Sequence, residues 1–369
     1  MEIAYMSTRI TLHNDKKSIY DICIESSFDN LPRELGQLDI SRRRLCIVSD
    51  SAVAGLYLNE LEALLTSCAR EVISFVFPAG EESKTLDTVR ELYEHLILHQ
   101  FDRKDLLIAL GGGVTGDLAG FAAATYLRGI EFVQVPTTLL AQVDSSIGGK
   151  TGVDFSSYKN MVGAFHNPSL VYINLSVLST LSERQYLSGL GEIVKYGLIN
   201  DPSYYDWISC HIEEIRRRDP GTCEEMISGS CHIKQGIVEE DWKEQGERAL
   251  LNFGHTLGHA IEKEMKFALL HGECVAIGSM AAAWLSCRRN LISEEDVHAL
   301  RALFDSLGVP RSLKADEIDP KAVLNAVKHD KKMDAGSIRF ILLGRIGQAY
   351  IETSVTEKEL EDALSAVLD

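Results

Sequence analysis

The stretch Leu106–Asp117 reads LLIALGGGVTGD, in which five apolar residues run directly into three glycines. An apolar run of this length that ends in glycines is typical of a buried strand with a turn at its carboxyl end. Glycines there allow backbone N–H groups to approach a pyrophosphate at the N-terminus of a following helix. The motif matches neither GxGxxG nor GxxxxGK(S/T). By itself it fits an ordinary tight turn as well as a nucleotide site.

The same pattern recurs on both sides of this stretch. Between the apolar runs, the segments Tyr57–Arg70 and Leu86–His99 show helical periodicity. Strand–helix alternation predicts a Rossmann-like α/β domain with a parallel sheet, and it places ligands at the carboxyl ends of the strands. The other predicted strands are Leu45–Val48 before Ser49-Asp50, Val72–Phe77 before Pro78-Ala79-Gly80, and Phe132–Val135 before Pro136.

The pattern changes near Thr180, after which apolar residues recur mainly at helical spacing. Only Ile338–Leu343 resembles a strand in this half. We therefore predict an α/β domain over residues 1–180 and a mainly α-helical domain over residues 181–369. The predicted helices span residues 184–200, 222–239, 250–268, 272–290 and 294–307.

The composition is that of an ordinary globular protein, with 45% apolar and 25% charged residues among 369. No apolar run reaches the roughly 20 residues of a membrane span, and MEIAYMSTRI has no signal-peptide pattern. Eight cysteines without a CxxC pair favour reduced thiols, so we expect a cytoplasmic protein. A net charge of −17 argues against nucleic-acid binding. A small anionic substrate would need a local cluster of Lys and Arg.

The segment Arg248–His271 reads RALLNFGHTLGHAIEKEMKFALLH. If it is helical, the steps of four, three and four place Arg248, Asn252, His255 and His259 on one stripe. Two imidazoles four residues apart can converge on a divalent metal with a third histidine and a carboxylate. The alternative is a surface helix with two solvated histidines. Because Arg248, Asn252 and His271 lie close in the sequence to these two histidines, we favour a functional site over a surface helix.

Other charged motifs also admit two interpretations. Glu81 and Lys84 follow a predicted strand, where they could hold a ribose or adenine or could simply begin a helix. The Gly148-Gly149-Lys150 turn offers backbone donors and an ammonium suited to phosphate. Glu192 and Lys195 are three residues apart and share a helical face, either as a metal ligand beside a substrate contact or as an exposed ion pair.

Taken together, these motifs resemble the 3-dehydroquinate synthase family from about residue 78 to residue 345. The stretches that carry the resemblance are GGGVTGDLAGFAAATYLRGIEFVQVPTTLLAQVDSSIGGKTGVD, KNMVGAF, GLGEIVKYGLI, LNFGHTLGHAIE, HGE and DKK. The resemblance implies a carbon–oxygen lyase of the shikimate pathway. Such an enzyme would convert 3-deoxy-D-arabino-heptulosonate 7-phosphate into 3-dehydroquinate and phosphate, on the way to chorismate and the aromatic amino acids.

The resemblance also implies two cofactors, NAD and Zn²⁺ (or Co²⁺). The implied reaction is a transient oxidation at C5 by NAD, followed by phosphate elimination, re-reduction, ring opening and intramolecular aldol closure. The substrate carries a carboxylate and a phosphate, and the family pattern gathers lysines and arginines around it. In a chain of net charge −17 that is the local cationic cluster such a substrate requires.

The family pattern assigns Glu192, His255 and His271 as metal ligands and places His259 beside the reacting centre. We expect Lys195, His259 and Asp144 to relay protons, and Arg128 to reach across a homodimer interface. The implied NAD contacts are Asp50, Glu81, Lys84, Gly112, Gly113, Val114, Gly116, Asp117, Thr137, Thr138, Lys150, Lys159 and Thr180. The implied substrate and catalytic positions are Asp144, Lys150, Asn160, Lys195, Lys234, Glu244, Arg248, Asn252, His259 and Lys331 or its neighbour Lys332.

Several residues differ from the motifs typical of the family, but none of these differences removes a proposed ligand. Three alternatives are weighed: another sugar-phosphate cyclase, a metal-dependent polyol oxidoreductase of the glycerol dehydrogenase type, and a binding protein that has lost catalysis. The SSIGGK turn and the Lys and Arg positions favour the synthase over the dehydrogenase, and intact ligand positions disfavour the binding protein. The departures are Tyr158, Ser182, Gln185, Gly191, Trp242 and Glu247.

Overall fold

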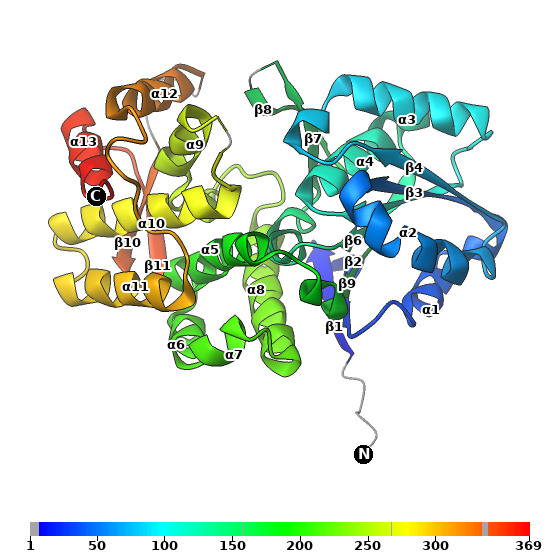
Figure 1. The fold of residues 1–369 in the computed structure, drawn as a ribbon, viewed down its shortest axis with the longest axis horizontal. Helices are drawn as coiled ribbons and strands as arrows, with labels where there is room; N and C mark the ends of the chain where they lie inside the picture. Colours follow the sequence, from blue (N-terminus) through cyan, green and yellow to red (C-terminus); the bar gives the residue numbers. More distant parts are fainter. Residues whose placement is uncertain (1–6, 157, 267, 334–338) are drawn as a thin grey trace. The chain divides into compact units, whose positions relative to one another are not determined.

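The computed structural model describes residues 7–156, 158–266, 268–333 and 339–369, apart from the side chains of residues 329–333. The chain forms two compact units, Met1–Leu181 and Ser182–Asp369. Figure 1 follows the elements from β1 in blue to α13 in red. None of the helices in the described ranges combines the length and apolar character needed to cross a bilayer.

The first unit is built on a seven-stranded sheet in the order β1-β2-β9-β6-β5-β3-β4, parallel except for β1. The four predicted strands lie in β3, β4, β5 and β6, so the Rossmann-like α/β class is confirmed. The inner strand β5 is buried at every residue, as expected of a parallel strand covered on both faces. The strands are β1 Thr8–Asn14, β2 Lys17–Glu25, β3 Arg44–Asp50, β4 Glu71–Phe77, β5 Leu106–Gly111, β6 Glu131–Pro136 and β9 Leu170–Asn174.

Helices cover both faces of this sheet and enclose two cores. Alternate residues of β5 serve the two sides: Leu107 and Ala109 pack with α3 and α4, whereas Ile108 and Leu110 pack with α1 and α2. The helices are α1 Leu31–Gly36, α2 Ser51–Thr66, α3 Leu86–Leu98 and α4 Gly113–Thr125. Short turns are η1 Ile40–Arg42, η2 Glu81–Ser83, η3 Tyr126–Arg128, the π-helical η4 Ala141–Ser145 and η5 Leu175–Ser179, and a hairpin is formed by β7 Lys150–Phe155 and β8 Tyr158–Phe165.

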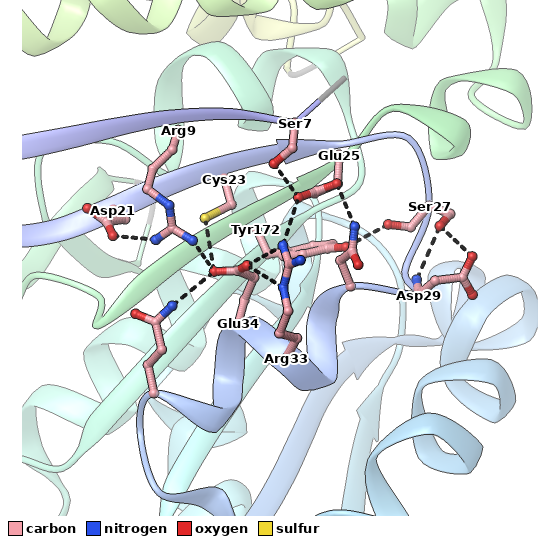
Figure 2. Close-up of polar contacts among 12 residues, drawn as sticks. Ser7, Arg9, Asp21, Cys23, Glu25, Ser27, Asp29, Arg33, Glu34 and Tyr172 are labelled. Atoms are coloured by element: carbon pink, nitrogen blue, oxygen red, sulfur yellow. Dashed lines mark hydrogen bonds and ion pairs between the residues drawn. The ribbon is translucent and has the colours of Figure 1, made fainter. Parts of the chain in front are cut away.

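A charged network joins the β1–β2 hairpin to α1 (Figure 2). The buried carboxylate of Glu34 accepts hydrogen bonds from Arg9 and from Arg33 Nη2, the latter at 2.9 Å. Asn30 Nδ2 donates to the buried Glu25 at 2.9 Å. Burial raises the pKa of Glu34, but Arg33 and Arg9 outweigh this effect and lower it. The network therefore holds the Glu34 carboxylate between Arg9 and Arg33 and ties α1 to the β1–β2 hairpin.

The second unit is mainly helical. The predicted helices over 184–200, 222–239, 272–290 and 294–307 correspond to α5, α8, α10 and α11, while Ile338 lies outside the described residues. Its elements are α5 Glu183–Ile199, α6 Pro202–Cys210, α7 Ile212–Arg216, α8 Pro220–Glu240, η6 Glu247–Asn252, α9 His255–Glu264, α10 His271–Arg288, α11 Glu294–Leu307, α12 Pro320–Met333, β10 Phe340–Arg345, β11 Gln348–Glu352 and α13 Glu357–Ser365.

The prediction of one helix over 250–268 is wrong. The 3₁₀ turn η6 ends at Asn252, and α9 begins only at His255. Between them Gly254 has φ of +79°, in the left-handed region that favours glycine. A Cβ on Gly254 would lie 2.5 Å from Ser279 Oγ and 2.7 Å from Ser279 N. The close approach of α10 therefore breaks the expected stripe, so Arg248 and Asn252 do not share a helix with the histidines.

Glycines let the backbones of α5, α9 and α10 touch. A Cβ on Gly278 of α10 would lie 1.9 Å from Gly254 O, and a Cβ on Gly191 of α5 would lie 2.3 Å from Gly272 O. Each predicted metal ligand is the immediate chain neighbour of one of these glycines: Glu192 follows Gly191, His255 follows Gly254, and His271 precedes Gly272. The spacing of the three ligands is thus set by direct backbone contact between helices.

Candidate active site

The predicted metal ligands converge within the second unit. Glu192 Oε1 lies 3.5 Å from His255 Nε2 and 3.4 Å from His271 Nε2. His259 belongs to the same group, because ligand atoms of the three histidines all lie within 4.8 Å of one another. Glu192 and His255 are buried, His271 is half-buried, and His259 is exposed. Side chains from α5, α9 and α10 therefore meet at one point.

The donor set suits a zinc- or cobalt-sized ion. Two ligands that bind a tetrahedral zinc at ordinary bond lengths stand about 3.3 Å apart, close to both of the Glu192 distances. His255 Nδ1 lies 3.0 Å from the Phe253 carbonyl oxygen. If Nδ1 donates to that oxygen, the lone pair of neutral His255 is left on Nε2, which faces Glu192. The residues present thus fit a metal, and whether His259 is a ligand or a neighbour stays a prediction.

Lys195 places a buried positive charge beside Glu192 and His255. Its ammonium forms an ion pair with Glu192 Oε2 and donates to Leu251 O at 2.8 Å, and it is 1% exposed. The exposed ion pair considered for Glu192 and Lys195 is therefore wrong. Burial and the nearby Lys195 charge hold the pKa of His255 well below its ordinary value. Burial alone would lower the pKa of His271, but the Glu192 and Glu262 carboxylates raise it to about 9.

The predicted substrate cations of this unit are also buried. Arg248 is 1% exposed in η6, and its Nη1 donates to the Trp242 main-chain oxygen at 2.8 Å. Because that contact uses the backbone, the departure at Trp242 leaves it intact. Asn252 Nδ2 donates to Glu244 Oε1 at 3.1 Å. Lys234 of α8 is 5% exposed, whereas the side chains of Lys331 and Lys332 lie outside the described residues.

A second charged cluster forms in the first unit, near the carboxyl end of β4. Lys84 Nζ donates to Asp117 Oδ2 at 2.7 Å and to Asn160 Oδ1 at 2.6 Å. Glu81 Oε1 lies 3.4 Å from Lys159 Nζ and 3.9 Å from Lys84 Nζ. Burial lowers the pKa of Lys84, but Asp117 and Glu81 outweigh this effect and raise it. Asn160, expected at the substrate, is thus placed among four residues expected to contact NAD.

Other predicted NAD contacts line the carboxyl edge of the sheet. Asp50 ends β3 and caps α2, and Thr115 Oγ1 donates to its Oδ2 at 3.4 Å. Gly112 precedes α4, and a Cβ on it would lie 3.1 Å from Thr138 Cγ2. Thr137 N donates to Gly111 O at 2.9 Å. The glycine turn therefore places a helix N-terminus at this edge, as a nucleotide site requires. The remaining members of the turn, Gly113, Val114 and Gly116, begin α4.

The other predicted residues are placed as follows. Burial raises the pKa of Asp117, and Asp144 lies close enough to that carboxyl to add to the effect. Thr180 contacts the Tyr57 hydroxyl. Asp144 lies in η4, and Lys150 begins β7 as an exposed residue. Arg128 is exposed and has φ of +72°, so the turn that carries it is in the left-handed region. The roles of these residues stay predictions.

Two contact residues were missed by the sequence reasoning. Glu262 is 3% exposed, and its Oε2 lies 3.6 Å from His271 Nδ1. Its spacing of seven and three residues from His255 and His259 marks the same helix face, which is a signal that the sequence did contain. Asp154 accepts from Asn160 N at 2.8 Å. That contact depends on the β7–β8 hairpin and has no comparable signal in the residue spacing.

Replacing Lys84 with methionine should weaken NAD binding about 10- to 100-fold, because charged hydrogen bonds typically contribute about 1.5–3 kcal/mol. The change removes the buried ammonium shared by Asp117 and Asn160. Fluorescence titration with NAD measures the effect. Lys159→Met is the matched control. The Lys159 side chain is 28% exposed, so its replacement should reduce NAD affinity less than Lys84→Met does. Equal NAD affinity in wild type and Lys84→Met, with both folded by thermal melting, would remove Lys84 from the NAD site.

Comparisons with known proteins point to the same family in both units. The model of the 3-dehydroquinate synthase N-terminal region matches residues 74–188, and that of the C-terminal region matches residues 189–333. The chain is 47% identical over 327 residues to 3-dehydroquinate synthase from Nitrosospira multiformis, covering 88% of this chain and 89% of that protein.

Solved structures show the same fold. A 2-epi-5-epi-valiolone synthase from Streptomyces hygroscopicus subsp. jinggangensis, with NAD⁺ and Zn²⁺ bound, has a TM-score of 0.88 and 30% identity, covering 97% of this chain and 99% of that one. A 2-deoxy-scyllo-inosose synthase complexed with carbaglucose-6-phosphate, NAD⁺ and Co²⁺ has a TM-score of 0.85 and 28% identity, covering 98% and 100%. With both family models matched in order over most of the chain, the protein belongs to the 3-dehydroquinate synthase family.

Proposed function

We propose that this protein is a 3-dehydroquinate synthase, which converts 3-deoxy-D-arabino-heptulosonate 7-phosphate into 3-dehydroquinate and phosphate. The observation that carries the proposal is the buried carboxylate of Glu192 facing the Nε2 atoms of both His255 and His271. It occurs in a chain 47% identical to a named synthase of this activity. That donor set is what a metal-assisted oxidation of a hydroxyl group needs.

The cofactors are NAD and Zn²⁺ or Co²⁺. When bound, the metal supplies a Lewis acid for a substrate oxygen, and NAD supplies a hydride acceptor that is restored within each turnover. Glu192, His255 and His271 would hold the metal. Glu81, Lys84, Asp117 and Lys159 would hold NAD, with the turn 112–116 at its pyrophosphate.

The chain's own side chains bind and orient an anionic sugar phosphate. Arg248 offers paired donors to a planar carboxylate, while Lys150 and Lys234 offer compact charges to phosphate. Lys195, His259 and Asp144 move protons at the substrate hydroxyl. Lys195 also holds the Glu192 carboxylate in position, since its ammonium contacts that carboxylate in a site with almost no exposure.

The proposed assembly is a cytoplasmic homodimer in which Arg128 reaches the partner's substrate. Its support is that Arg128 is exposed on a turn with positive φ, where it projects from the surface without burial in its own unit. No nucleic-acid partner is proposed, given the net charge of −17.

The test is to incubate the pure protein with the heptulosonate phosphate, catalytic NAD and Zn²⁺, and to follow phosphate and NADH together. We expect stoichiometric phosphate release without lasting NADH. Persistent NADH with glycerol would instead identify a polyol dehydrogenase. Phosphate release from another sugar phosphate alone would identify a different cyclase, and silence with every substrate would identify a binding protein.

A further inference from the structure

The imidazole of His271 lies between two buried carboxylates. Glu192 Oε1 is 3.4 Å from its Nε2, and Glu262 Oε2 is 3.6 Å from its Nδ1. Glu262 is 3% exposed and sits two helical turns after His255 on α9. The ring therefore has one nitrogen toward the proposed metal position and the other toward a carboxylate that is not among the predicted ligands.

A histidine that binds a metal does so as a neutral imidazole, and this gives the arrangement a consequence. One nitrogen carries the proton and the other carries the lone pair, and the hydrogen-bond partner of the first decides which is which. A carboxylate beside Nδ1 favours the proton there and leaves the lone pair on Nε2. Carboxylate partners of this kind orient ligand histidines and increase their basicity. The ring of His255 is held in the same sense by the Phe253 carbonyl at 3.0 Å.

We propose that Glu262 is a positioning residue that fixes the tautomer and orientation of His271 for metal binding. The proposal rests on the metal role given above for Glu192, His255 and His271. Glu262 is not itself a ligand, because its contact is with the ring nitrogen opposite the one that faces Glu192. Of the two ligand imidazoles, one is thus oriented by a main-chain carbonyl and the other by a side-chain charge.

The chain offers a matched control in Glu273. This carboxylate is also buried, at 4% exposure, and lies two residues after His271. It is held instead by Arg184, at 2.8 Å and 2.7 Å, and by Leu270 N at 2.7 Å. Glu273→Gln therefore removes a buried charge from the same helix end without touching the His271 ring.

The experiment uses the full chain stripped of metal and titrated with Co²⁺ against a competing chelator, with the d–d absorption spectrum recorded at saturation. For Glu262→Gln we expect affinity to fall about 10- to 100-fold and the spectrum to change. Glu262→Asp, which keeps the charge but withdraws it by one methylene, should fall between Gln and wild type. Glu273→Gln should lower the melting temperature of the metal-free protein while keeping the wild-type Co²⁺ affinity and spectrum.

Wild-type affinity and spectrum in Glu262→Gln would overturn the proposal, as would equal losses in Glu262→Gln and Glu273→Gln. If Glu262→Gln does not fold, Glu262→Asp decides: wild-type affinity there would overturn the proposal, and weakened affinity supports it. A wild-type protein that binds Co²⁺ but does not release phosphate from the heptulosonate would refute the proposed function and leave this inference standing. Failure of the wild type to bind Co²⁺ would refute both.

Discussion

Glu192→Gln should lose tightly bound metal and lower turnover to background. The substitution keeps the volume of the side chain but removes the negative charge that both ligand imidazoles face. It also leaves the Lys195 ammonium, which is 1% exposed, without the carboxylate that balances it. Breaking such a buried pair costs about 3–5 kcal/mol. Metal content after dialysis, measured by atomic absorption, separates loss of the ion from loss of the fold seen by circular dichroism.

His259→Ala is the control for this prediction. His259 is exposed and was assigned to the reacting centre, so this variant should keep its metal while turnover falls. The opposite result, metal lost in His259→Ala and kept in Glu192→Gln, would show that the three histidines form the site without the carboxylate. The two variants thus distinguish the donor sets that the geometry brings together.

Gly278→Ala should destabilise the second unit and weaken metal binding. The added Cβ would lie 1.9 Å from Gly254 O, so α9 and α10 must move apart. Overpacking of a core costs about 1–3 kcal/mol and occasionally more. Because His255 follows Gly254 directly, the same movement displaces a proposed ligand. Urea unfolding of the metal-free protein measures the free energy, and Co²⁺ titration measures the affinity.

Gly236→Ala provides the contrast within the same unit. Gly236 lies in α8, and nothing stands within 4 Å of a Cβ built there. Alanine should therefore stabilise the protein by about 0.5–1 kcal/mol, since glycine is the poorer helix former. A Gly278→Ala variant as stable as wild type would mean that α9 and α10 have room to separate, and that glycine contact does not set the ligand spacing.

The parts of the fold that could be predicted were those with a strong local pattern. β3 to β6 are nearly continuous apolar runs that end in turn residues, and α11 begins and ends at the predicted residues. The strands β1 and β2 were missed, although Ile10 and Leu12 alternate with polar residues in β1 and β2 ends in a buried apolar run, because the prediction rested on the longer apolar runs after residue 44. The hairpin β7–β8 was also missed, and only the Gly148-Gly149-Lys150 turn that leads into it was interpreted, as a phosphate turn. Its strand character depends on pairing, with Gly152 opposite Gly163, and not on local apolar residues.

The site shows the same division between local and long-range information. His255 and His259 could be grouped from spacing alone, because one helix carries both. Glu192 and His271 lie on two other helices. The residues alone suggested Glu192 as one of two interpretations and His271 as a nearby histidine, and the family resemblance then assigned both as ligands. The structure supplies the physical reason for their meeting, which is contact of glycine backbones that no spacing reveals. The break at Gly254 was also missed. It is caused by the close approach of Ser279 from α10, which the local sequence does not reveal.

The interruption at Gly254 between η6 and α9 bears on how substrate preference could change among related enzymes. Arg248 and Asn252 lie before it in η6, whereas the imidazoles lie after it in α9. Because the two segments are not one continuous helix, we expect substitutions around η6 to change the proposed substrate contacts more than the orientation of the histidine rings. If Arg248 and Asn252 bind substrate as proposed, the residues that select the sugar and those that hold the metal lie on two segments joined through the left-handed Gly254.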